Sequence, residues 1–183
     1  MTFNPQFAKL GDILVHEGII SEDKLMEALD SQKTNKNKLG DILIKMGEIT
    51  EQDLVKAFSL QTGHKPLAED ELFQADIVTA KLIPEEFAIE KNILGLRHTE
   101  SMISIAMEDP EDLASLDTIR KLTNLSPEIY VAAKSSIEKA IDRIYEKVKQ
   151  TGEVETAISQ ISIVRGDEEK SDELDLATEK VSA

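Results

Sequence analysis

Apolar positions in the first third of the chain recur with the spacing of amphipathic helices. Between residues 10 and 14 they stand three and four apart, and a second stripe of the same kind spans residues 25–32. This spacing predicts two short helices. Gly18 stands where a left-handed C-terminal cap would end the first helix, and Ser21 stands where an N-cap would begin the second.

The same pattern returns 29 residues later. The segment KLGDILV at residues 9–15 recurs as KLGDILI at residues 38–44. Over the 24 positions that begin there, 12 residues are identical in the second copy, and five residues separate the two copies. Gly47 and Thr50 repeat the two caps. The first 64 residues are therefore predicted to form a four-helix unit with an internal two-fold similarity.

The middle of the chain changes to short apolar runs. Runs of the length of β-strands stand at residues 92–96, 102–107 and 128–133. Stretches with helical spacing stand between and after them, at residues 113–122 and 136–145, and a short helix is expected to open at Pro84. From about residue 152 the sequence becomes acidic and poor in aromatic residues, which is typical of a linker or a disordered tail.

The sequence thus predicts an α+β protein in three parts. A tandem-repeat helical subdomain is expected at residues 1–64, a small α/β subdomain at residues 65–150, and a flexible acidic linker or tail at residues 151–183.

Composition narrows the range of functions. The net charge is −15, which argues against a DNA or RNA partner because non-specific nucleic-acid binding depends on clustered Lys and Arg. The absence of cysteine excludes disulfides, thiol catalysis and zinc sites built on Cys. No apolar run approaches the roughly 18 residues of a spanning helix. We therefore expect a cytoplasmic protein without direct membrane insertion, at most peripheral at the inner membrane through partners.

Motifs for catalysis and for metal binding are missing from the sequence. The eight glycines never give the spacing of a phosphate-binding Walker A loop, and no HExxH segment occurs. The three histidines are scattered. We therefore expect no enzymatic activity, no catalytic residue, no metal and no cofactor.

Three kinds of residue, each present in both copies of the repeat, fit a plain helical core poorly. A glycine inside a helix costs about 1 kcal/mol relative to alanine, a lysine at a helix start opposes the helix dipole, and an amide at the end of an apolar stripe needs a partner. These residues are Gly11 and Gly40, Lys9 and Lys38, and Gln32 and Gln61. Their joint duplication indicates a site with two similar halves, and the glycines indicate close approach of either another helix or a ligand.

This pattern resembles the motif of the MshEN domain, the cyclic di-GMP-binding N-terminal regulatory domain of type II secretion and type IV pilus assembly ATPases. In that family the motif stands twice with a five-residue spacer, as it does here. Its leading residue is typically Arg, where this chain has Lys9 and Lys38. Residues 82–145, with the segment AMEDP at residues 106–110, resemble the rest of the same N-terminal domain.

The resemblance implies one cyclic di-GMP site to which both copies contribute. From the first copy it implies contacts at Lys9, Leu10, Gly11, Asp12, Leu14, Gly18, Leu25, Leu29 and Gln32. From the second copy it implies contacts at Lys38, Leu39, Gly40, Asp41, Leu43, Gly47, Leu54, Phe58 and Gln61.

Two functions remain open on these grounds. The first is a cyclic di-GMP receptor that controls the motor domain of a secretion or pilus assembly ATPase. The second is a docking module without a nucleotide, which links such an ATPase to its inner-membrane platform protein. The intact Gly, Leu and Gln positions favour the first, and the two lysines in place of arginine favour the second.

Overall fold

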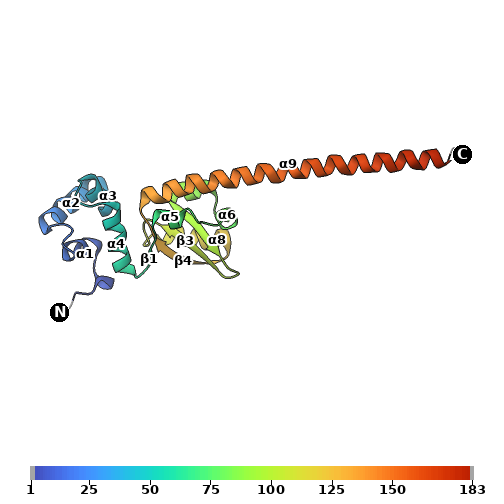
Figure 1. The fold of residues 1–183 in the computed structure, drawn as a ribbon. Helices are drawn as coiled ribbons and strands as arrows, with labels where there is room; N and C mark the ends of the chain where they lie inside the picture. The colour runs from blue at the N-terminus through green and yellow to red at the C-terminus, as the bar shows by residue number, and fades with distance from the viewer. Residues whose placement is uncertain (1–2, 182–183) are drawn as a thin grey trace. The chain divides into compact units, whose positions relative to one another are not determined.

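The computed structural model describes the backbone of residues 3–181 and the side chains of residues 3–160. Its N-terminal part consists of short helices, as the repeat predicts (Figure 1). A single 3-10 turn, η1 (Pro5–Phe7), precedes the helices α1 (Leu10–His16), α2 (Glu22–Asn35), α3 (Leu39–Lys45) and α4 (Glu51–Thr62).

The predicted caps are present at the ends of these helices. Gly18 and Gly47 follow α1 and α3 with φ of 69° and 74°, the left-handed conformation that glycine adopts at little cost. The Ser21 hydroxyl accepts a hydrogen bond from the Lys24 amide at 3.3 Å. Thr50 forms a complete capping box, in which its own backbone amide donates to the Asp53 carboxylate at 2.8 Å.

Helices of the two copies pack against each other. The first helix of each copy contacts the second helix of the other, so that α1 packs on α4 and α3 packs on α2. Ile13, Leu14 and Leu43 are fully buried between them. This exchange of partners gives the pseudo-symmetric unit one shared core, which neither copy could bury alone.

A four-stranded sheet follows the repeat. Its order is β1-β4-β3-β2, from the strands β1 (Lys65–Pro66), β2 (Ile93–His98), β3 (Met102–Met107) and β4 (Ser126–Val131). Strands β2 and β3 pair antiparallel, whereas β3 and β4 pair parallel. A parallel pair requires a crossover, which α8 (Leu113–Thr123) supplies. The strands β2, β3 and β4 confirm the prediction that the three apolar runs form β-strands.

Further helices complete the α+β region. Three short ones, α5 (Glu69–Leu72), α6 (Ile77–Ala80) and α7 (Glu85–Lys91), lie between β1 and β2 in the chain. The start of α9 (Lys134–Val181) packs by Ile137, Ile141 and Ile144, which are at most 2% exposed. No helix among the described residues is long and apolar enough to cross a membrane.

The chain divides into two compact units, Met1–Tyr145 and Glu146–Ala183. Val131 and Ala133 belong to the same hydrophobic core as the repeat helices. The subdomain bounds at residues 64 and 150 stay predictions. The backbone of α9 is helical as far as Val181, where a flexible acidic tail was expected. The side chains from residue 161 onward lie outside the described part.

Candidate ligand site

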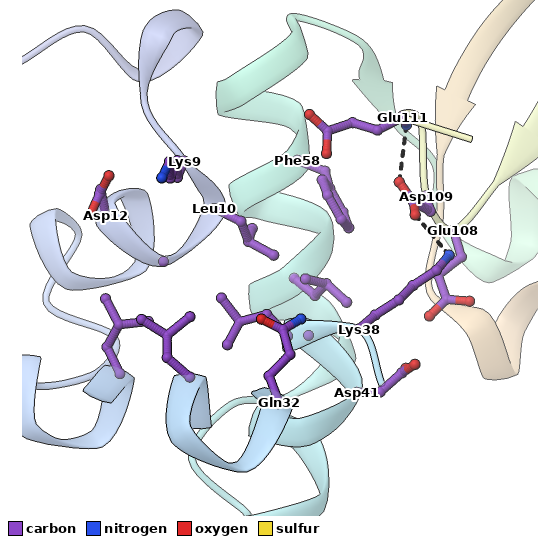
Figure 2. Close-up of a pocket in the computed structure, with 16 residues that line it drawn as sticks. Lys9, Leu10, Asp12, Gln32, Lys38, Asp41, Phe58, Glu108, Asp109 and Glu111 are labelled. Atoms are coloured by element: carbon purple, nitrogen blue, oxygen red, sulfur yellow. Dashed lines mark hydrogen bonds and ion pairs between the residues drawn. The ribbon is translucent and has the colours of Figure 1, made fainter. Parts of the chain in front are cut away.

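A cavity of about 460 Å³ opens between the two copies of the repeat (Figure 2). Six equivalent positions line it in both copies. The matched pairs are Lys9 and Lys38, Leu10 and Leu39, Gly11 and Gly40, Asp12 and Asp41, Leu25 and Leu54, and Leu29 and Phe58. Gln32 completes the part of the lining that the repeat supplies. Thirteen of the eighteen residues that the sequence singled out therefore meet at one cavity.

The two helical glycines each lie close to a leucine side chain of the next helix. A Cβ added at Gly11 would stand 2.5 Å from Cδ1 of Leu25, and one added at Gly40 would stand 2.9 Å from Cδ2 of Leu54. Carbon atoms in contact prefer about 3.5–4.0 Å, so a methyl group at either position would force its leucine side chain to shift. The close approach expected from the sequence is therefore that of a second helix of the same copy.

Each glutamine donates a hydrogen bond to the backbone carbonyl directly before the lysine that begins the other copy. Gln32 Nε2 donates to the carbonyl of Asn37 at 2.9 Å, directly before Lys38. Gln61 Nε2 donates to the carbonyl of Ala8 at 3.0 Å, directly before Lys9. Each glutamine thus fixes the start of the other copy's first helix, which explains its duplication. Gln61 lies outside the cavity lining, and its Oε1 is buried without a partner among the described residues.

Four more of the expected residues lie outside the cavity lining. Leu14 and Leu43 are fully buried in the core between the helices. Gly18 and Gly47 are exposed at the ends of α1 and α3, with nothing within 4 Å of an added Cβ. Core packing accounts for the two leucines, and helix capping accounts for the two glycines. Both requirements recur with the helical repeat and therefore appear in the motif.

The lysines at the two helix starts have different surroundings. Figure 2 shows Lys38 reaching toward Asp109, with its Nζ 2.7 Å from Oδ2 of that carboxylate. Burial alone would lower the pKa of Lys38, but the hydrogen bond and charge of Asp109 outweigh it and raise that pKa. Lys9 makes no ion pair with any residue in the described part of the chain. The two halves of the cavity are thus alike in sequence and unlike in charge pairing.

Acidic residues of the α+β region close one side of the cavity. Glu108, Asp109 and Glu111 line it from the turn between β3 and α8. Burial raises the pKa of Glu108, and the charges of Asp41 and Asp109 add to that rise, against the lowering effect of Lys134 and Lys38.

Sequence reasoning missed these three residues as part of the site. They stand about 70 positions from Lys38 and carry no repeat signal; only their place in or next to the AMEDP segment pointed to that turn. No group of three or more His, Cys, Asp or Glu in the searched, described part is arranged to hold a metal ion.

The sequence model of the MshEN domain matches residues 64–151, the α+β region and the start of α9 that follows it. A solved structure of MshE with cdg is 31% identical, with a TM-score of 0.68, and the match covers 75% of this chain and 99% of that one. The chain belongs to the MshEN domain family. The match to MshE is long enough to include part of the repeat as well as the region that the family model covers.

Two other relatives extend the comparison. The N-terminal domain of XpsE has the same fold, with a TM-score of 0.65 at 16% identity over 78% of this chain and 97% of that chain. The type IV pilus assembly ATPase PilB of Myxococcus xanthus (strain DK1622) is 30% identical over 138 residues, which are 75% of this chain and 24% of PilB. The chain thus spans about a quarter of the length of that ATPase.

Proposed function

We propose that this MshEN domain binds cyclic di-GMP in the cavity between its two repeats and so regulates the motor domain of a secretion or pilus assembly ATPase. The observation that carries the proposal is the pairwise lining of the cavity by six equivalent positions. The cavity of about 460 Å³ lies within the range of roughly 300–1,000 Å³ that small-molecule sites occupy. The related MshE was solved with cdg, which we read as cyclic di-GMP.

The chemistry of the lining suits a ligand with two like halves. Cyclic di-GMP is a two-fold symmetric dianion that carries two guanines. The leucine side chains offer apolar surface to the bases, and each half of the cavity supplies one lysine for a phosphate. A carboxylate such as Asp12 or Asp41 can accept a hydrogen bond from the edge of a guanine. The site acts by binding alone, and the domain works in the cytoplasm together with the motor domain that it regulates.

Titration calorimetry of the whole chain with cyclic di-GMP, at stated salt, tests the proposal. Leu29→Ala removes a cavity-lining side chain of α2 that is 39% exposed, so it should weaken binding without unfolding the protein. Met26→Ala is the matched control, because Met26 is 64% exposed on the same helix and lies outside this cavity. Absence of binding to the wild type, or equal losses in the two variants, would contradict the proposal.

The charge of the cavity favours a second candidate function. Five carboxylates line it against two lysines, an unfavourable balance for a dianion. In this alternative the domain is a docking module that links the ATPase to its inner-membrane platform without any nucleotide. It predicts that the wild type binds the cytoplasmic part of the platform protein with the same affinity whether or not cyclic di-GMP is present. Binding that changes with cyclic di-GMP would exclude it.

A further inference from the structure

In one half of the cavity, the lysine is already ion-paired with a carboxylate of the turn between β3 and α8. Asp109 Oδ2 lies 2.7 Å from Lys38 Nζ, and this carboxylate is 20% exposed while the lysine is 65% exposed. Lys38 belongs to α3 of the second repeat, whereas Asp109 belongs to the α+β region. The contact therefore joins two parts of the unit that are 71 residues apart in the chain.

The pairing is held in place from the Asp109 side. The other carboxylate oxygen of Asp109, Oδ1, accepts a hydrogen bond from the backbone amide of Glu111 at 3.0 Å. This bond within the turn fixes the carboxylate while Oδ2 faces the lysine (Figure 2). The equivalent Lys9 has no such partner in the described part of the chain.

From this asymmetry we infer that Asp109 is an internal competitor for the anionic ligand, and that it sets the affinity of the site. The inference rests on the proposed function. A phosphate that binds Lys38 competes with the Asp109 carboxylate for the charge of the same ammonium group, and the two anions repel each other at that distance. The half of the site at Lys9 accepts a phosphate without such competition. Ligand binding thus weakens the contact of the β3–α8 turn with α3, and that weakening is specific to the second repeat.

The test compares two substitutions that each remove one negative charge from the cavity lining. Asp109→Asn keeps the shape of the residue and an oxygen for the Glu111 amide, but it no longer pairs with Lys38. Glu111→Gln is the matched control, since Glu111 lines the same cavity and makes no ion pair with Lys38. We expect Asp109→Asn to lower the Kd for cyclic di-GMP about fivefold, which corresponds to about 1 kcal/mol. Glu111→Gln should change the Kd by less than about twofold at 0.15 M salt, because screening weakens unpaired exposed charges.

Each outcome of the calorimetry decides the matter. If Asp109→Asn binds cyclic di-GMP more tightly than Glu111→Gln does, the result supports Asp109 as a competitor of the ligand. This holds even if the wild type binds too weakly to measure. A wild type that binds, with equal effects of the two substitutions or weaker binding by Asp109→Asn, overturns the competitor and leaves the proposed function intact. No binding by any of the three overturns both. Circular dichroism of each variant shows that the fold is unchanged.

Discussion

The substitution Gly11→Ala should weaken ligand binding at a modest cost in the stability of the fold. The added Cβ would stand 2.5 Å from Cδ1 and 3.1 Å from Cδ2 of Leu25, so that leucine must move. Leu25 lines the cavity, which is the open space beside it. Overpacking costs about 1–3 kcal/mol, while alanine in place of glycine inside a helix returns about 1 kcal/mol. Gly11→Ala should therefore lose about 0–2 kcal/mol of unfolding free energy. Its Kd for cyclic di-GMP should rise about tenfold as Leu25 enters the cavity.

Gly18→Ala provides the control for this experiment. Gly18 has a φ of 69° and nothing within 4 Å of an added Cβ, so alanine there costs about 1 kcal/mol through backbone strain alone. Urea denaturation should then show similar stability losses for the two variants, and calorimetry should show weaker binding only for Gly11→Ala. Adding Leu25→Val to Gly11→Ala should recover part of the affinity. Wild-type affinity in Gly11→Ala, or an equal loss of affinity in Gly18→Ala, would refute the steric reasoning.

Three further outcomes are expected. Gln61→Ala should lower the unfolding free energy by about 1–2 kcal/mol and Gln32→Ala by less, because the Gln61 bond is part-buried and the Gln32 bond is exposed; equal losses in urea denaturation would contradict this. Lys9→Arg and Lys38→Arg should keep or strengthen cyclic di-GMP binding, since a guanidinium retains the charge and can stack on a base; calorimetry checks this, and a loss in both variants counts against it. Burial, with a contribution from the charge of Glu85, raises the pKa of Tyr145 to about 12. The stability that comes from its neutral phenol is present below about pH 10, the ordinary pKa, and is lost as the pH rises toward 12. Tyr145→Phe should remove that alkaline loss in denaturation curves, and an unchanged pH profile would show that another group is responsible.

The helices, their caps and the candidate cavity could be predicted from the sequence because they depend on local or repeated signals. The 3.6-residue period places Leu10, Leu25 and Leu29 on faces that meet, and the capping positions follow from glycine and hydroxyl residues at fixed offsets. Because 12 of 24 positions are identical between the copies, equivalent residues of both copies are expected to line the same cavity. The motif did not distinguish residues that face the cavity from Leu14 and Leu43, which face the core, because both faces repeat with the same period.

Contacts between distant segments carry no such signal. The pairing of Lys38 with Asp109 depends on where the sheet packs against the helices, and no periodicity within either segment encodes it. The same holds for the Gln61 bond to Ala8, 53 residues away, and the acceptors of both glutamine bonds are backbone carbonyls that any residue could supply. The acidity of residues 151–183 predicts an acidic linker or flexible tail, and the backbone of α9 continues through them as far as Val181.

The asymmetry between the repeats also reaches the start of α9. Glu51, the first residue of α4, accepts hydrogen bonds from the Ser135 amide at 3.3 Å and from the Ser135 hydroxyl, where its negative charge suits the first turn of a helix. Its equivalent in the first repeat, Glu22, is exposed and has no such bond in the described part. One turn further along α4, Leu54 lines the cavity. If the proposed ligand shifts α4, that shift would move Glu51, which caps α9, whereas a shift of α2 in the first repeat has no equivalent contact in the described part through which to act.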